Sequence, residues 1–182
     1  HSLAEDVGAW VLSHALDDLE KLLLGGHKLP ISINVFPRQF VAQEFAPQLQ
    51  RLLDQHVAIE PEHVELEIVE TAALNDLEGA RRVMLTCQDI GVRCALDDFG
   101  TGYSSLSHLK YLPASTLKID RSFISDLLCD PDDLAIVEGT LNLAMAFGHQ
   151  VIAEGVETIE QGVKLIELGC TFGQGYAITR PM

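Results

Sequence analysis

The chain has 182 residues, 47% of them hydrophobic, and carries 12 lysines and arginines against 27 acidic residues, a net charge of -15. This length and composition allow one substantial hydrophobic core, and we expect a single domain over residues 1–182. The excess of negative charge disfavours binding to DNA, RNA or an anionic membrane. The apolar runs are shorter than the ~20 residues of a membrane span, so none is expected in this segment.

Four cysteines, Cys87, Cys94, Cys129 and Cys170, are scattered through the chain without a C-x-x-C pair. Neither a zinc site nor a disulfide framework is expected from this spacing. We expect buried, reduced thiols, which fit a cytoplasmic location.

A long helix is predicted at the start of the chain. Leu3, Val7, Trp10 and Leu19 recur at helical spacing over residues 3 to 24. The pair Gly25-Gly26 then supplies a C-terminal stop.

After this helix, short β-rich runs alternate with longer helical stretches, which is typical of consecutive βα units around a parallel sheet. Asp130-Pro131 predicts one helix start and Thr158 with Gln161 predicts another, as a capping box. The six predicted strands are Ile31 to Val35, Val64 to Val69, Val92 to Asp98, Thr116 to Asp120, Gln150 to Val156 and Cys170 to Tyr176.

The third of these strands leads directly into two adjacent acids, Asp97 and Asp98, and a glycine-containing loop. Their mutual repulsion is relieved either by solvent or by a divalent cation. Asp98-Phe99-Gly100 matches a kinase tripeptide, but the other kinase motifs are missing. Gly100-Thr101-Gly102 lacks the third glycine of a dinucleotide fingerprint. The alternative to a cation site at these two acids is an ordinary solvated turn at the end of the strand.

Polar residues stand at or beside the carboxyl end of every predicted strand. In a closed parallel barrel these ends meet at one mouth, where catalytic residues lie. Carboxylate and amide oxygens suit Mg²⁺ or Mn²⁺, and two such ions often serve phosphodiester cleavage. A network of surface ion pairs is the alternative. The residues are Asn34, Glu67, Glu70, Asp97, Asp98, Lys118, Asp120, Glu154, Glu157 and Gln174.

Ordered blocks over almost the whole chain resemble one family, the EAL-domain cyclic di-GMP phosphodiesterases of bacterial second-messenger signalling. The resemblance implies a (β/α)₈ barrel of the TIM type, with six of the eight strand units visible in this chain. No Glu-Ala-Leu tripeptide occurs, so we expect the first strands of the barrel to lie before residue 1. The matching blocks are Ser32 to Val35, Glu65 to Thr71, Leu96 to Leu106, Leu117 to Asp120, Val151 to Thr158 and Gly169 to Tyr176 with Pro181-Met182.

The resemblance also implies two Mg²⁺ or Mn²⁺ ions and hydrolysis of cyclic di-GMP to linear pGpG. By position, Asn34, Glu67 and Asp97 are similar to the ligands of one ion. Asp97, Asp98 and Glu154 are similar to the surroundings of the second, so that Asp97 bridges the two.

Further roles follow from the same resemblance. Lys118 matches the lysine that holds the attacking water, and Glu154 matches a group that helps to deprotonate it. Glu70 matches the acid that braces the loop after Asp98, and this loop, Phe99 to Ser105, is tied to dimerisation in the family. The expected substrate-binding residues are Asp120, Gln174, Phe99 and Gly100.

Three functions remain open at this point: an enzyme, a non-catalytic cyclic di-GMP receptor, and an interaction scaffold. The intact set of acids favours the enzyme. Without the family's Glu-Ala-Leu glutamate, the 182 residues alone are expected to be weakly active or inactive. Expected partners are cyclic di-GMP, a second copy of the chain, and fused sensory or GGDEF-type domains, through which the protein could be tethered to the inner membrane.

Overall fold

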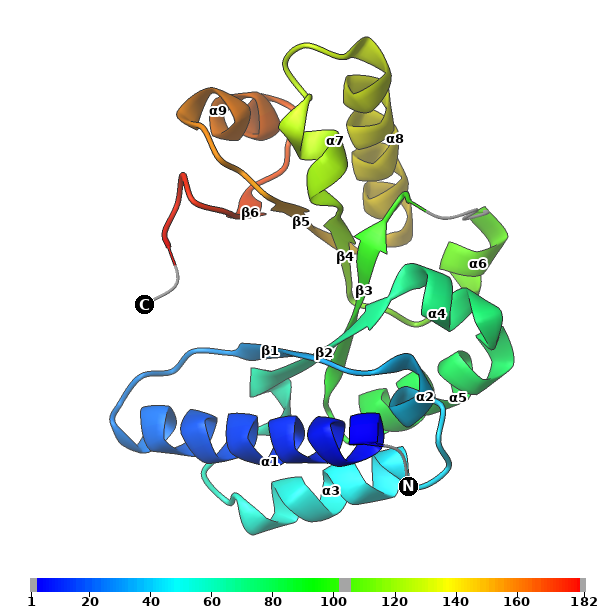
Figure 1. Ribbon diagram of the computed structural model, residues 1–182, viewed down its shortest axis with the longest axis vertical. Coiled ribbons are helices and arrows are strands. Elements are labelled where there is room, and N and C mark those ends of the chain that lie inside the picture. The colour runs from blue at the N-terminus through cyan, green and yellow to red at the C-terminus, as the bar shows by residue number, and fades with distance from the viewer. Residues whose placement is uncertain (1–2, 102–105, 181–182) are drawn as a thin grey trace. The chain divides into compact units, whose positions relative to one another are not determined.

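The computed structural model describes residues 3–101 and 106–180, and the chain forms two compact units. The first contains His1–Ala95 and Tyr111–Pro113, and the second contains Leu96–Lys110 and Ala114–Met182. Figure 1 shows the helices and strands of both units in the colours of their order along the chain. The single-domain interpretation stays a prediction.

In the first unit, strands β1 and β2 pair in parallel, with Asn34 beside Glu67, and the strand order is β1-β2-β3. Helix α1 lies alongside α3 (Figure 1). The elements are α1 (Leu3–Leu24), β1 (Ile31–Asn34), α2 (Pro37–Phe40), α3 (Phe45–Gln55), a 3-10 turn η1 (Pro61–His63), β2 (Val64–Val69), α4 (Glu70–Asn75), α5 (Leu77–Asp89) and the start of β3 (Arg93–Phe99).

Helix α1 has the bounds that its spacing predicted, and Gly26 follows it with a φ of 88°. Its buried face carries Leu12, Leu16 and Leu19. Burial of each such leucine contributes about 2 kcal/mol, so this face anchors the helix. Trp10 helped to mark the helix but is 59% exposed, on the other side of it.

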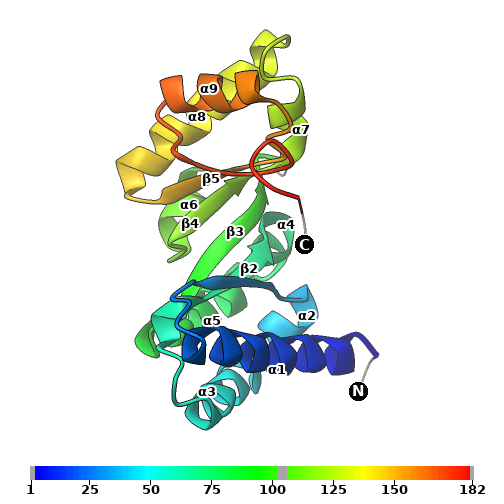
Figure 2. The ribbon, with the colours of Figure 1, turned by 90° about the vertical axis from the view of Figure 1, so that its left-hand side faces the viewer.

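In the second unit, β4, β5 and β6 pair in parallel, with β3 beside β4. Helices α7, α8 and α9 lie on the same side of β4 and β5 (Figure 2). The elements are the end of β3, α6 (Leu106–Tyr111), β4 (Thr116–Ile119), α7 (Arg121–Ser125), α8 (Pro131–Phe147), β5 (Gln150–Glu154), α9 (Ile159–Glu167) and β6 (Phe172–Gln174).

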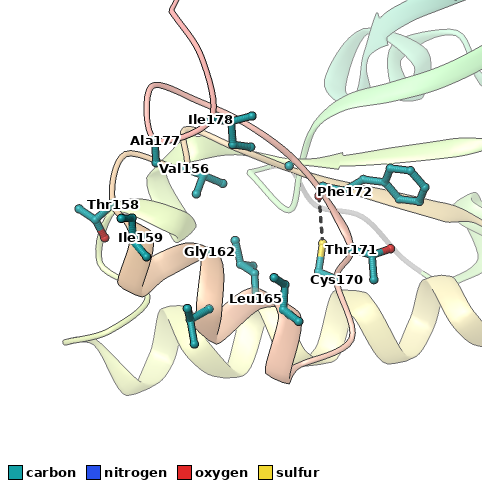
Figure 3. A pocket seen from close by; sticks show the side chains of 13 residues that line it. Val156, Thr158, Ile159, Gly162, Leu165, Cys170, Thr171, Phe172, Ala177 and Ile178 are labelled. Atoms are coloured by element: carbon teal, nitrogen blue, oxygen red, sulfur yellow. Dashed lines mark hydrogen bonds between the residues drawn. The ribbon is translucent and has the colours of Figure 1, made fainter.

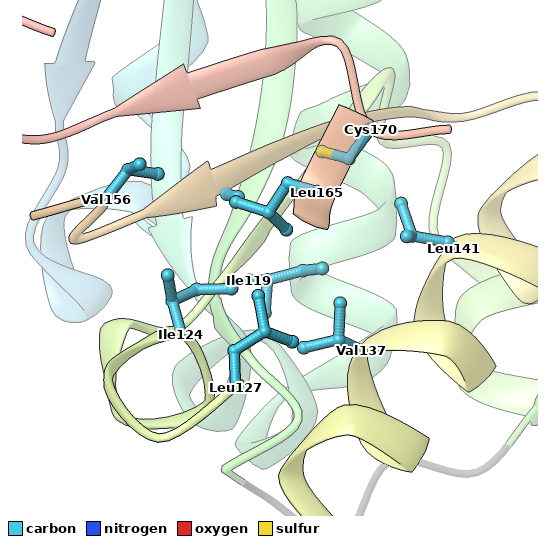
Figure 4. Packing of buried hydrophobic residues seen from close by; sticks show 9 residues of the cluster. Ile119, Ile124, Leu127, Val137, Leu141, Val156, Leu165 and Cys170 are labelled. Carbon is cyan, nitrogen blue, oxygen red and sulfur yellow. The ribbon is translucent and has the colours of Figure 1, made fainter. Parts of the chain in front are cut away.

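A hydrophobic cluster joins these helices to the sheet (Figure 4). Ile119 of β4 and Ala153 of β5 meet Ile124 of α7, Val137 of α8 and Leu165 of α9, all of them buried. Since each strand and helix contributes, the cluster fixes the carboxyl ends of β4 and β5.

Both predicted helix starts are confirmed. The Asp130 side chain accepts a hydrogen bond from the Asp132 amide at 2.8 Å, ahead of α8. Thr158 and Gln161 form the capping box of α9. Gln161 also donates from Nε2 to the Ile124 carbonyl at 2.9 Å, which ties the start of α9 to α7.

Six strands lie among the described residues, at the six predicted places. The last two are shorter than predicted. Strand β5 ends at Glu154 and not at Val156. Strand β6 spans only Phe172–Gln174, because Cys170 packs in the hydrophobic cluster and the chain turns at Gly175. Buried cysteines are confirmed except at Cys129, which is exposed. A hydrogen bond with Cys87, together with burial, raises the pKa of Cys94 well above its usual value.

No helix among the described residues combines the length and the apolar character that a bilayer span requires.

Ionisation of His56 makes stability depend on pH. Its Nδ1 lies 2.7 Å from the Leu52 carbonyl and its Nε2 lies 3.0 Å from Asp17 Oδ1. The hydrogen bond to Leu52 raises the pKa of His56 above 6.5, burial opposes this, and the hydrogen bond to Asp17 adds to it. Because the folded state favours protonated His56, this residue adds to the free energy of unfolding. The added stability is complete below pH 6.5 and is lost as the pH rises through the raised pKa of the folded state.

We therefore expect the free energy of unfolding in urea to fall between about pH 6 and pH 9, and Asp17→Asn to flatten this dependence. Asp18→Asn is the control, since Asp18 contacts Lys21 at 2.7 Å and should leave the pH dependence unchanged. An unchanged slope in Asp17→Asn would contradict the assignment.

Replacement by alanine should have opposite effects at two glycines, one inside α8 and one directly after it. Gly139 lies inside the helix with open space around it, so Gly139→Ala should stabilise by about 0.5–1 kcal/mol. Gly148 follows the helix at a φ of 75°, also in open space, so Gly148→Ala should destabilise by about 1 kcal/mol. Urea unfolding of both variants tests the pair, and shifts of the same sign would contradict it.

Candidate active site

Three carboxylates gather at the strand ends of the second unit. Asp97 and Asp98 of β3 and Glu154 of β5 each offer an oxygen within 4.8 Å of the others. All three come from positions that the sequence singled out. Three acids so close repel one another unless a positive charge lies among them.

Lys118 supplies that charge from β4, the strand between them in the sheet. Its Nζ lies 3.2 Å from Asp97 Oδ1 and 2.7 Å from Glu154 Oε1, and its side chain is only 4% exposed. Side chains alternate along a strand, so Ile119 enters the hydrophobic cluster while Lys118 faces the opposite side. The ion pairs compensate the cost of burying an ammonium group.

The backbone at Asp98 explains how two adjacent acids can serve one site. Successive side chains of a regular strand point to opposite faces. Asp98 has a φ of 54° and is the only non-glycine with a positive φ in residues 3–101 and 106–180. This left-handed conformation interrupts the alternation and brings its carboxylate to that of Asp97.

Asp98 also interacts with Asp120, which follows β4. Burial, and then the charges of Asp97 and Asp120, raise the pKa of Asp98. Burial would also raise the pKa of Asp120, but hydrogen bonds from the Ser122 hydroxyl and amide, with one from Asp98, outweigh it and lower that pKa. The pKa values of these two neighbouring carboxyl groups are therefore shifted in opposite directions.

A cavity of about 250 Å³ adjoins the carboxylates at the ends of β5 and β6. The strand register places Gln174 beside Glu154, and both line the cavity. Arg121 and Tyr176 were not predicted. Arg121 could have been noticed because it directly follows the strand-end Asp120. The lining residues are Arg121, Glu154, Gly155, Glu157, Gln174, Gly175 and Tyr176.

The remaining predicted ligands belong to the first unit. Asn34 and Glu67 are register partners at the ends of β1 and β2, and Glu67 is buried. Glu65 is buried on the same strand, 3.4 Å from the Ser32 hydroxyl, and was not predicted. Glu70 is the buried first residue of α4. The roles of these acids stay predictions.

The beginning of the predicted loop packs inward. Phe99 is buried, and Gly100 has a φ of 100°, where a Cβ would come within 3.0 Å of the Phe123 ring. Residues 102–105, the rest of this loop, lie outside the described residues, as do Pro181 and Met182.

A second cavity of the same unit, about 280 Å³, is mainly apolar (Figure 3). Val156 and Ile178 face Ile159 and Leu165 of α9 across it. Inside it, the Cys170 thiol donates to the Phe172 carbonyl at 3.3 Å. No acidic residue lines this cavity, so the charged chemistry belongs to the first one.

Comparison with known proteins gives the family. The EAL domain family matches residues 1–181. The bifunctional diguanylate cyclase/cyclic di-GMP phosphodiesterase MucR of Pseudomonas aeruginosa is 40% identical over 181 residues, which cover 99% of this chain and 26% of MucR.

Solved structures agree. The MucR phosphodiesterase in complex with c-di-GMP has a TM-score of 0.92 at 40% identity, over 97% of this chain and 72% of that one. The EAL domain of Mycobacterium smegmatis DcpA has a TM-score of 0.93 at 39% identity, over 100% of this chain and 81% of that one.

The chain therefore belongs to the EAL domain family. Its predicted fold class, a (β/α)₈ barrel of the EAL type with six strand units in this chain, is confirmed. The chain spans about a quarter of the length of MucR.

Removal of Lys118 should destabilise the protein in a metal-chelating buffer. Lys118→Met leaves Asp97 and Glu154 without their counter-ion, and breaking such a buried pair costs about 3 kcal/mol or more. Lys28→Met is the matched control, because Lys28 is exposed. Urea unfolding provides the measurement, and equal effects of the two substitutions would contradict the role given to the ion pairs.

Proposed function

We propose that this domain hydrolyses cyclic di-GMP to linear pGpG with the help of two Mg²⁺ or Mn²⁺ ions. The observation that carries the proposal is the contact of Lys118 with both Asp97 and Glu154 beside Asp98, in a chain of the EAL family. MucR, a relative whose name includes this phosphodiesterase activity, supports it, as does the c-di-GMP complex of the MucR domain.

The donor set fits a hard divalent cation, because oxygens of Asp97, Asp98 and Glu154 converge within 4.8 Å. These residues would hold one cation, and Asn34 and Glu67 with Asp97 would hold the other. The bound cations would polarise the phosphodiester and make a water molecule more acidic.

The protein's own groups then handle the water and its proton. Lys118 Nζ, fixed between Asp97 and Glu154, can donate a hydrogen bond that orients the water oxygen toward phosphorus. Glu154 accepts the proton as the new P–O bond forms. The P–O3′ bond breaks, and O3′ leaves as a hydroxyl after it has taken up a proton from a solvent water molecule. Glu70 and Asp120 act as positioning residues, for the loop after Asp98 and for Asp98 itself.

The four predicted substrate contacts complete the proposal. Gln174 lines the cavity next to Glu154, which suits a contact with the dinucleotide. Asp120, Phe99 and Gly100 belong to the same unit as the carboxylates.

A receptor that binds cyclic di-GMP without cutting it is the alternative function. It is favoured by one observation: Lys118 contacts both Asp97 and Glu154 and so offsets part of their negative charge from within the protein.

We further propose a cytoplasmic, homodimeric protein with fused sensory or GGDEF-type domains, tethered to the inner membrane where those domains provide an anchor. The bifunctional relative MucR, about four times as long as the matched segment, supports further domains. The exposed thiol of Cys129 suits a reducing compartment.

The test of the activity is hydrolysis of cyclic di-GMP with different cations. Mg²⁺ or Mn²⁺ should support formation of pGpG, while a chelator should abolish it. Ca²⁺ should inhibit, because its larger radius and looser coordination spoil the required geometry. Full activity in the chelator would refute the mechanism, whereas tight binding without turnover under every condition would identify the receptor.

Two substitutions separate the roles of the charged groups. Asp97→Asn removes the proposed bridging charge and should abolish both turnover and metal binding. Lys118→Ala should leave metal binding in place and lower kcat by about a hundredfold or more. Calorimetric titration with Mn²⁺ and steady-state kinetics check both variants. Loss of metal with retained hydrolysis in Lys118→Ala would show that the roles are assigned wrongly.

A further inference from the structure

Helix α9 carries an apolar stripe on the side that faces away from its own core. Gln161 and Leu165 are buried, and Leu165 points into the hydrophobic cluster (Figure 4). Ile159, Val163 and Ile166 follow one another at spacings of four and three residues, which places them along one face of the helix. They are 75%, 50% and 65% exposed, so most of this face is open to solvent in the described part of the chain.

A groove of about 450 Å³ lies beside this stripe. Its lining includes Ile159 and Val163 of the helix, together with Leu128 from the turn between α7 and α8. Leu128 is itself 51% exposed. Ile166 is not among the lining residues. The surface of this unit therefore offers both an apolar hollow and, further along α9, a projecting apolar side chain.

Charged side chains complete the lining of the same groove, and they carry both signs. They are Glu160, Lys164 and Glu167. Lys164 takes part in none of the salt bridges found between residues 3–101 and 106–180. An apolar stripe edged by acidic and basic groups can match a second surface of the same kind, because each copy supplies both signs.

Antiparallel pairing of two α9 helices brings the hollow of one copy to the projecting side chain of the other. A two-fold axis between Gly162 and Val163 sets Ile159 opposite Ile166 of the second copy. Ile166 of the second copy then enters the groove beside Leu128, and the axis repeats this contact at the other end. Gly162, at the centre, has no side chain that would hold the helices apart.

The same axis also pairs the charges. It leaves Lys164 within one residue of Glu160 of the second copy, a difference of about 1.5 Å along the helices. Because the axis repeats the contact, two such pairs form at the edge of the apolar stripe. Neither ammonium group nor carboxylate has to be fully removed from water there, so the pairs avoid most of the cost of desolvation.

We propose that this face of α9, formed by Leu128, Ile159, Val163 and Ile166, is an interface that binds a second copy of this chain about a two-fold axis. A second copy fits better than an unrelated protein, because one surface supplies the hollow, the projection and both charges of each pair. Two chains with a net charge of -15 repel each other, so the dimer should be weak and reversible.

Sedimentation velocity of the protein in about 0.15 M salt tests the interface, because a Debye length of about 8 Å then screens the repulsion between the chains. The unmodified protein should pass from monomer to dimer as its concentration rises. Ile159→Asp should raise the dissociation constant of the dimer about tenfold or more, since it places a carboxylate in the apolar contact. An acid in the first turn suits the helix itself, so α9 should be retained. Val57→Asp is the matched control, because Val57 is exposed in the other unit, and it should leave the dimer unchanged.

An exchange of charges tests the antiparallel pairing. Lys164→Glu and Glu160→Lys should each weaken the dimer about tenfold, because each substitution sets like charges opposite each other at both ends. An equimolar mixture of the two variants should regain the dimer, since every glutamate then meets a lysine of the other variant. Equal thermal unfolding midpoints verify that the variants fold.

Three results would each refute the interface: a monomer at every concentration, a dimer that survives Ile159→Asp, or a mixture that associates no better than its components. A monomer would mean that another protein, and not a second copy, covers this face. Assemblies larger than a dimer would contradict a closed two-fold contact. None of these measurements contains cyclic di-GMP, so their outcome and that of the proposed hydrolysis are independent.

Discussion

The charge balance around Lys118 is the constraint on which the site depends. Its ammonium group contacts Asp97 on one neighbouring strand and Glu154 on the other, so β3, β4 and β5 are joined at their carboxyl ends by electrostatics as well as by backbone pairing. The same alternation that turns Lys118 toward the acids turns Ile119 into the hydrophobic cluster. Packing of the helices therefore sets the position of the lysine, and the lysine sets the spacing of the carboxylates.

Sequence patterns predicted the local features well. The bounds of α1 follow from apolar spacing and a glycine stop, and the start of α9 follows from Thr158 and Gln161, since each signal lies within a few residues. The family resemblance predicted the barrel type, which periodicity alone left open. The start of β6 was predicted two residues too early, because Cys170 packs against elements that are distant in sequence.

The arrangement of the site was harder to predict from the sequence. The sequence predicts that Asp97 and Asp98 end a strand, but a regular strand would separate their side chains, and nothing in the residue types shows that Asp98 adopts a positive φ. Arg121 was missed because its relation to the cavity depends on Gly155, more than thirty residues away, passing beneath it. Contacts of this kind are set by tertiary packing and have no local signal.

The strongly negative net charge of the chain restricts how its site could attract an anionic ligand. A chain with a net charge of -15 would repel the proposed substrate, a dinucleotide that carries two phosphodiester charges, so attraction would have to come from the site itself. In the proposed function the acids of the cluster would provide it by recruiting cations, since Lys118 is already engaged by Asp97 and Glu154. Neutral contacts with the bases gain importance in such a setting, because they add affinity without adding repulsion. In the proposed function, a site that relies on metal ions to bind phosphate would thus discriminate against nucleic acids in general, whose many phosphates it could not neutralise.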